Sequence, residues 1–244
     1  WKNINHLLSE LKRRHPKVCL EQYYGLKRGG PWALRSVNCD ENYYESKGAM
    51  MNRFQTWHNE NDRFRPVYKN YAGLFGSDAE DFRLNVLTAI STTSYAQISK
   101  GFHMLSAEEN REFLKKWRTW ATSNFEYLKV KRDLFDCPGL KPIDGSAHII
   151  KDRGFVFLFS PDHDEKDVRA SIPINRWIQL EENPDAVYEI KEVYPNKGKV
   201  LATVKYGDDF LYDIPKKSAV ILSIELAPSG AQPSQSLPAD QGKK

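Results

Sequence analysis

The sequence predicts an α/β segment over residues 1–141, with the order of elements typical of an α/β barrel, followed by an antiparallel β-sandwich over residues 142–226. Two observations carry this prediction. In the first segment, amphipathic helices alternate with short apolar runs that end in polar loops. In the second, apolar residues recur at every other position in several short runs separated by turn signals, which is the pattern of half-buried antiparallel strands.

The first segment opens with a helix-to-strand pair. Ile4, Leu7, Leu8 and Leu11 have helical spacing, and Pro16 ends the predicted helix. The apolar run 18–20 then predicts a short buried strand. Further along, we expect a helix over 79–89 and a strand or loop over 90–98.

The boundary between the two segments follows a long helix that begins near Ser106. Its apolar face is rich in tryptophan, and this spacing favours core packing over a sugar-binding platform. The helix stops near Pro138. At the other end of the chain, residues 227–244 are rich in Pro, Ser, Gly and Gln, which predicts a disordered tail.

Composition excludes several classes of protein. The formal net charge of +4 is small for 244 residues, so nucleic acid is not an expected partner. No apolar run approaches the ~18 residues of a membrane span. The three cysteines are too widely spaced for a zinc knuckle or a redox pair, and His58 and His103 lack the partner spacing of metal ligands. We therefore expect no metal site and no cofactor.

The candidate site lies in the stretch 18–45, where the predicted strand runs into a loop dense in charged and aromatic residues. A buried strand that ends in such a loop is how a barrel enzyme presents a ligand site. The candidate ligand-binding residues are Glu21, Lys27, Arg28, Trp32 and Arg35, and the acidic pair Asp40-Glu41 follows.

The order of these elements resembles the C-terminal portion of the α-galactosidase clan of retaining glycoside hydrolases. Residues 21–32 are similar to the clan's strand and Gly-Gly-Arg-type loop, and Ser36-Val-Asn-Cys-Asp40 is similar to the stretch that carries a catalytic Asp. Residues 81–94 are similar to the segment that closes the barrel, and residues 147–161 to the opening of the sandwich. The chain departs from the clan at Pro31-Trp32 and in Val37-Asn-Cys39, which stands in place of a Trp-Thr-Ser run.

This resemblance implies the C-terminal half of a TIM (β/α)8 barrel followed by a β-sandwich, and a hydrolase acting on α-linked sugars such as α-galactosides. Retaining glycosidases use two carboxyl groups about 5–5.5 Å apart. By resemblance Asp40 is the acid/base, and the nucleophile belongs to an earlier strand, upstream of Trp1. The chain begins with Trp1 and not Met, so we expect an incomplete enzyme whose signal peptide is not visible. The resemblance favours a periplasmic or secreted protein.

Each candidate also has a structural interpretation. Asp40 has the residue type of a helix N-cap or an Asx turn, and Glu41 is the alternative carboxylate. Glu21 is placed to pair with Lys27 or Arg28, Trp32 to pack under a barrel rim, and the basic residues to be solvated. The second functional hypothesis is accordingly a non-catalytic carbohydrate-binding or scaffold protein on the same architecture. The partner in either case is an oligosaccharide or glycoside, and the sequence does not indicate an oligomeric state.

Overall fold

The computed structural model describes residues 2–18, 20–23, 39–42, 53, 68–73, 78–91, 95–97, 102–138, 143–160 and 168–235. Within these ranges the chain forms two compact units, Trp1–Asn110 and Arg111–Lys244. Helix α5 begins at the end of the first unit and continues into the second.

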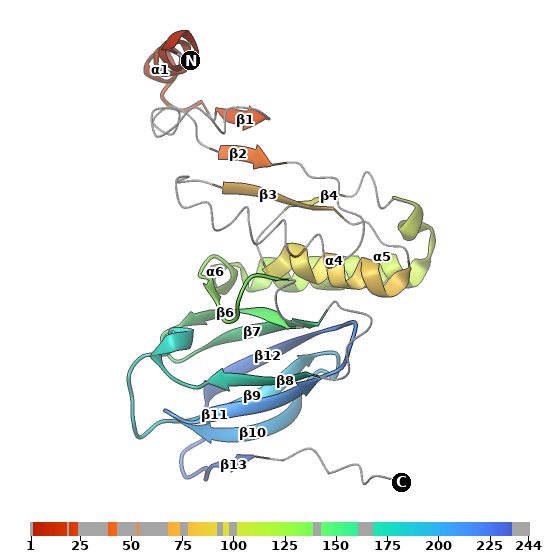
Figure 1. Cartoon of the computed structure of the whole chain (residues 1–244), viewed down its shortest axis with the longest axis vertical. Coiled ribbons are helices and arrows are strands. Elements are labelled where there is room, and N and C mark those ends of the chain that lie inside the picture. Colours follow the sequence, from red (N-terminus) through yellow and green to blue (C-terminus); the bar gives the residue numbers. More distant parts are fainter. Residues whose placement is uncertain are drawn as a thin grey trace. The chain divides into compact units, whose positions relative to one another are not determined.

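The first unit contains a four-stranded sheet in the order β1-β2-β3-β4, in which every neighbouring pair is parallel (Figure 1). Its elements are α1 (Lys2–Arg14), β1 (Glu21–Tyr23), β2 (Cys39–Asn42), β3 (Tyr68–Gly73), α4 (Ala79–Ser91), β4 (Tyr95–Gln97) and the 3-10 turn η3 (Phe102–Ser106). Parallel neighbours need a crossover connection between them, and α4 supplies the one between β3 and β4.

Helix α4 shows how sequence sets the fold of this unit. The Asp78 carboxylate accepts the backbone N–H groups of Glu80 and Asp81, each at 2.9 Å, and so caps the helix at the predicted position. The helix is then buried on nearly every side, from Asp81 to Ser91. From Leu84 onward the helix carries no charged residue, and such an uncharged, mainly apolar helix belongs in a core.

The predicted strand at 18–20 is shifted in the structure. Strand β1 begins at Glu21, and Val18 is exposed after the end of α1. Val18 and Leu20, the described residues of the run, precede the strand, whose pairing with β2 begins at Glu21. Ile90 and Ser91 likewise complete α4, and the strand expected within 90–98 is β4.

The second unit is mainly antiparallel. Its long sheet has the order β13-β10-β9-β12-β7-β6-β5, and β8 and β11 form a separate two-stranded ribbon. The elements are α5 (Glu108–Ser123), α6 (Phe125–Leu128), β5 (Arg132–Asp133), β6 (Asp144–Ile150), β7 (Arg153–Ser160), β8 (Val168–Pro173), η4 (Arg176–Ile178), β9 (Val187–Tyr194), β10 (Lys199–Lys205), β11 (Asp209–Ile214), β12 (Ser218–Leu226) and β13 (Ser234–Gln235).

The central strands of the long sheet, β6, β7 and β12, bury both of their faces. Alternate residues such as Val156, Leu158 and Leu222 share one apolar cluster with Ile172 of β8 and Phe210 of β11, so this face packs on the ribbon. The residues between them along each strand belong to the opposite face of the sheet, which packs against helices.

The second face carries the aromatic side chains of the helices. Trp120 of α5 contacts Phe155 edge-on with ring centroids 4.8 Å apart, and Tyr127 of α6 contacts the same ring at 5.6 Å. Trp117, only 1% exposed, contacts Tyr194 at 5.5 Å. The prediction that the tryptophan-rich helix face is core packing is confirmed for this helix.

The C-terminal segment corrects one prediction. Residues 227–235 were expected to begin a disordered tail, but β13 pairs with β10, with Ala202 opposite Gln235. The Thr203 hydroxyl accepts from the Ser234 backbone N–H at 2.9 Å and donates to the Gln232 carbonyl at 2.6 Å. These hydrogen bonds hold a segment whose composition alone predicts disorder.

The coarse fold class is confirmed: an α/β portion is followed by a portion built of antiparallel strands. The domain limits at 141/142 and 226/227 remain predictions.

Candidate active site

The parallel sheet places Asp40 at the centre of a row of paired residues. Asp40 of β2 is opposite Gln22 of β1 on one side and Tyr68 of β3 on the other. The next row along the strands joins Tyr23, Glu41 and Lys69. The parallel pairing of three strands thus brings residues 22, 40 and 68 into register.

This register separates the two candidate carboxylates. Successive positions of a strand belong to opposite faces of its sheet, so positions 40 and 41 serve different faces. Glu21 pairs with Cys39, which puts position 21 in the same alternate set as position 41. Positions 40 and 41 therefore cannot both serve a site on the same face, and position 21 shares the face of position 41.

The remaining predicted site residues, Lys27, Arg28, Trp32 and Arg35, lie outside the described residues. His58 does so as well, and His103 is exposed at η3. Among the described residues, no three His, Cys, Asp or Glu side chains lie together as metal ligands. In the same part of the chain, no helix is both long and apolar enough to span a membrane.

The second unit contains a hydrogen-bonded Ser–His pair, the combination of hydroxyl and base that activates a serine nucleophile. The sequence did not indicate this pair. Nε2 of His148 lies 2.9 Å from Oγ of Ser146, two residues earlier on β6. Burial, and secondarily the charge of Lys131, lower the pKa of His148 to about 4. Both side chains are fully buried, so no substrate carbonyl can reach the hydroxyl, and the pair is part of the packing between the sheet and the helices.

Comparison with known proteins gives fold relatives. The wild-type GH27 β-L-arabinopyranosidase of Geobacillus stearothermophilus aligns with 93% of this chain at 10% identity and a TM-score of 0.58. A single-substitution variant of that enzyme in complex with arabinose aligns with 92% of this chain at 11% identity and the same TM-score. A maltogenic α-amylase of Thermotoga neapolitana aligns with 91% of the chain at 11% identity and a TM-score of 0.56. No family model matches the sequence, and no curated protein does.

These relatives fix the class of fold. All three structures are glycoside hydrolases, and the predicted resemblance to the α-galactosidase clan is confirmed at the level of fold by the GH27 enzyme. The chain spans 55% of the length of the arabinopyranosidase and 59% of the amylase.

Proposed function

We propose that this chain is the later part of a glycoside hydrolase that cleaves α-linked sugars by a retaining mechanism, with Asp40 as the acid/base. The observation that carries the proposal is the position of Asp40 in the middle strand of three parallel neighbours. In barrel enzymes, catalytic residues come from the ends of several adjacent parallel strands. Asp40 stands two residues before the carboxyl end of β2.

The four parallel strands are, in this proposal, the second half of a (β/α)8 barrel, and the antiparallel unit is the sandwich that follows it. The fold relatives support this arrangement because each is a glycoside hydrolase and each extends well beyond the part that aligns. A nucleophilic carboxylate would come from a strand of the other half. Asp40 would protonate the leaving oxygen and then remove a proton from the attacking water.

The proposed substrates follow from local sequence resemblance together with the fold. α-Galactosides are the first substrates to test, because the matching stretches 21–32 and 36–40 resemble that clan. β-L-Arabinopyranosides are the second, because an enzyme named for that activity shares the fold. The candidate sugar-binding residues that accompany Asp40 are Lys27, Arg28, Trp32 and Arg35. Glu21, which shares the face of Glu41, belongs with the alternative carboxylate.

The test is hydrolysis of a panel of nitrophenyl α- and β-glycosides by the full-length protein and its Asp40→Asn variant. We expect cleavage of one α-glycoside series, and a loss of about 10²–10⁴-fold in the variant, because that is what a positioned general acid contributes. Undiminished activity in the variant would remove Asp40 from the mechanism. Oligosaccharide binding without cleavage of any substrate would favour the non-catalytic carbohydrate-binding protein.

A further inference from the structure

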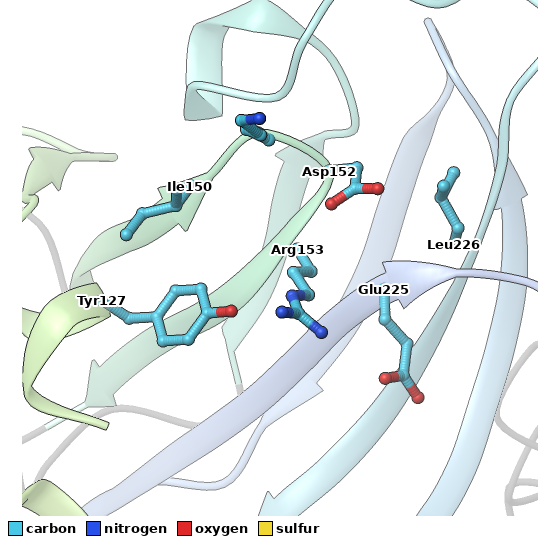
Figure 2. Close-up of a pocket in the computed structure, with 7 residues that line it drawn as sticks. Tyr127, Ile150, Asp152, Arg153, Glu225 and Leu226 are labelled. Carbon is cyan, nitrogen blue, oxygen red and sulfur yellow. The ribbon is translucent and has the colours of Figure 1, made fainter. Parts of the chain in front are cut away.

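The second unit contains a surface pocket of about 430 Å³ that the sequence analysis did not identify (Figure 2). Its lining comes from α6, from the turn between β6 and β7, and from the end of β12. Four charged side chains contribute, Lys151, Asp152, Arg153 and Glu225. The volume lies within the range of small-molecule sites, about 300–1,000 Å³.

The turn that forms the pocket is held from both sides. Ile150 and Arg153 are paired across a two-residue hairpin, and Lys151 adopts a left-handed backbone conformation with φ of 61°. The Lys151 carbonyl accepts the backbone N–H of Glu181 at 2.8 Å. The charged groups at 151–153 therefore project from a fixed frame, which lowers the entropic cost of binding a ligand.

Arg153 has unused hydrogen-bonding capacity. Its guanidinium makes no ion pair or hydrogen bond with any residue that the structure describes, and Figure 2 shows it extending between Tyr127 and Glu225. Glu225, by contrast, accepts from the Lys191 ammonium group, which also pairs with Glu189 at 2.6 Å. The pocket thus presents one unengaged planar donor group beside carboxylate acceptors.

The mixture of groups indicates the chemistry of the ligand. Two cationic and two anionic side chains line the pocket, so their formal charges sum to zero and the lining does not select for a phosphate or another anion. Donors and acceptors side by side suit neighbouring hydroxyl groups, each of which donates one hydrogen bond and accepts others. The Tyr127 ring, fixed by its edge-on contact with Phe155, and the exposed Leu226 add apolar surface.

We propose that this pocket binds a neutral sugar residue and is a saccharide-binding site distinct from the one at Asp40. Arg153 donates to sugar hydroxyls, Asp152 and Glu225 accept from them, and Tyr127 and Leu226 contact the C–H face of the ring. The proposal does not depend on the activity proposed for the parallel sheet, because every residue that it uses belongs to the second unit.

The experiment is a titration of the ¹⁵N-labelled protein with neutral galactose, glucose and arabinose, and with glucuronate and glucose 1-phosphate as anionic probes. We expect a neutral sugar to shift the amide resonances of Lys151, Asp152 and Gly154 in a saturable way. The same titration is repeated on Arg153→Gln and Asp152→Asn. Loss of a charged hydrogen-bonding partner is expected to weaken binding about ten-fold or more.

Arg118→Gln is the matched control, because Arg118 is an exposed arginine on α5 away from the pocket. It should bind like the wild type, as should Asp40→Asn, whose site is separate. Both pocket variants change surface side chains, so an unchanged melting temperature verifies that they fold. Three results would overturn the proposal: no shift at 151–154 with any neutral sugar, shifts that Arg153→Gln and Asp152→Asn leave unchanged, or tighter binding of the anionic probes.

Discussion

Nε2 of His148 lies 2.9 Å from Oγ of Ser146, and both side chains are enclosed between the long sheet and the helices that cover it. Burial of the imidazole, followed by the nearby charge of Lys131, lowers the pKa of His148 to about 4. The carbonyl groups of Val130 and Leu128 and the charge of Asp133 oppose this shift without cancelling it.

This burial predicts a pH dependence of stability. In the unfolded chain His148 has a pKa near 6.5, so between about pH 6.5 and pH 4 the unfolded state binds a proton that the folded state does not. The free energy of unfolding therefore falls as the pH is lowered through this window, by about 1.4 kcal/mol per pH unit and about 3 kcal/mol in all. Above pH 6.5 the residue contributes no pH dependence.

Chemical denaturation at pH 7, 6 and 5 measures the effect. His148→Gln should lose less stability between pH 7 and pH 5 than the wild type does. Ser146→Ala, which removes the hydroxyl but keeps the buried imidazole, should be less stable by about 1 kcal/mol at every pH and keep the wild-type slope. Equal slopes in His148→Gln and the wild type would contradict the assignment.

Gly154 is the position where the hairpin between β6 and β7 admits no side chain. A Cβ atom there would lie 2.0 Å from the carbonyl oxygen of His148, and the residue has φ of 157°. The other two nearest atoms, Cα of Ile149 at 2.9 Å and the carbonyl carbon of His148 at 3.0 Å, are also backbone, which cannot turn away as a side chain could. Gly154→Ala should therefore destabilise the protein by roughly 2–4 kcal/mol, within the range of overpacked cores and strained backbone positions.

Gly198→Ala separates the two causes. Gly198 also has a positive φ, 85°, but a Cβ atom there meets nothing within 4 Å. Its substitution should cost only the left-handed conformation, about 1 kcal/mol. Thermal denaturation of both variants makes the comparison, and equal losses would mean that the close approach to His148 is relieved by a small backbone shift.

Two tryptophans of the second unit, one buried and one exposed, should respond to substitution in opposite ways. Trp117 is 1% exposed and makes edge-on or tilted contacts with Phe113, Trp120 and Tyr194. Trp117→Ala should destabilise by about 3–5 kcal/mol, because it removes a large buried ring and leaves a cavity. Denaturant unfolding followed by circular dichroism provides the measurement.

Trp177→Ala is the control. Trp177 is 57% exposed on η4, and its ring is covered by the Arg132 guanidinium at 4.8 Å. An exposed cation–π contact is worth about 0.5–1 kcal/mol, so this substitution should cost no more than that. A loss at Trp177 as large as that at Trp117 would mean that its surroundings are more enclosed than the structure shows.

Sequence periodicity predicts the elements well where one physical pattern dominates. The helical spacing in α1 and α5, the start of α4 at residue 79 and the period-two runs of β7 and β12 all appear in the structure. The tail is different: hydrogen bonds to Thr203 hold residues that have no apolar pattern of their own. Amino-acid composition cannot predict the pairing of two strands that are some 30 residues apart in the chain.

The ligand sites are harder to predict from the sequence than the helices and strands are. Asp152-Arg-Gly154 reads as a turn signal and nothing more, because Tyr127 and Glu225, which complete the pocket, come from distant parts of the chain. Similarly, the adjacent pair Asp40-Glu41 offers two carboxylates of equal chemical merit. Only the strand register assigns them to different faces.

The assignment of positions 40 and 41 to opposite faces predicts more than a loss of activity on substitution. Because positions 40 and 41 serve opposite faces of β2, only one of Asp40→Asn and Glu41→Gln should impair glycoside cleavage, and we expect it to be Asp40→Asn. An acid that protonates the leaving oxygen matters most when the leaving group is a poor one. The Asp40→Asn defect should therefore grow from nitrophenyl to unsubstituted phenyl glycosides, while Glu41→Gln follows the wild type with both. A uniform defect across leaving groups in Asp40→Asn would indicate a structural role at β2, and a leaving-group-dependent defect in Glu41→Gln would transfer the acid/base role to the other face of the sheet.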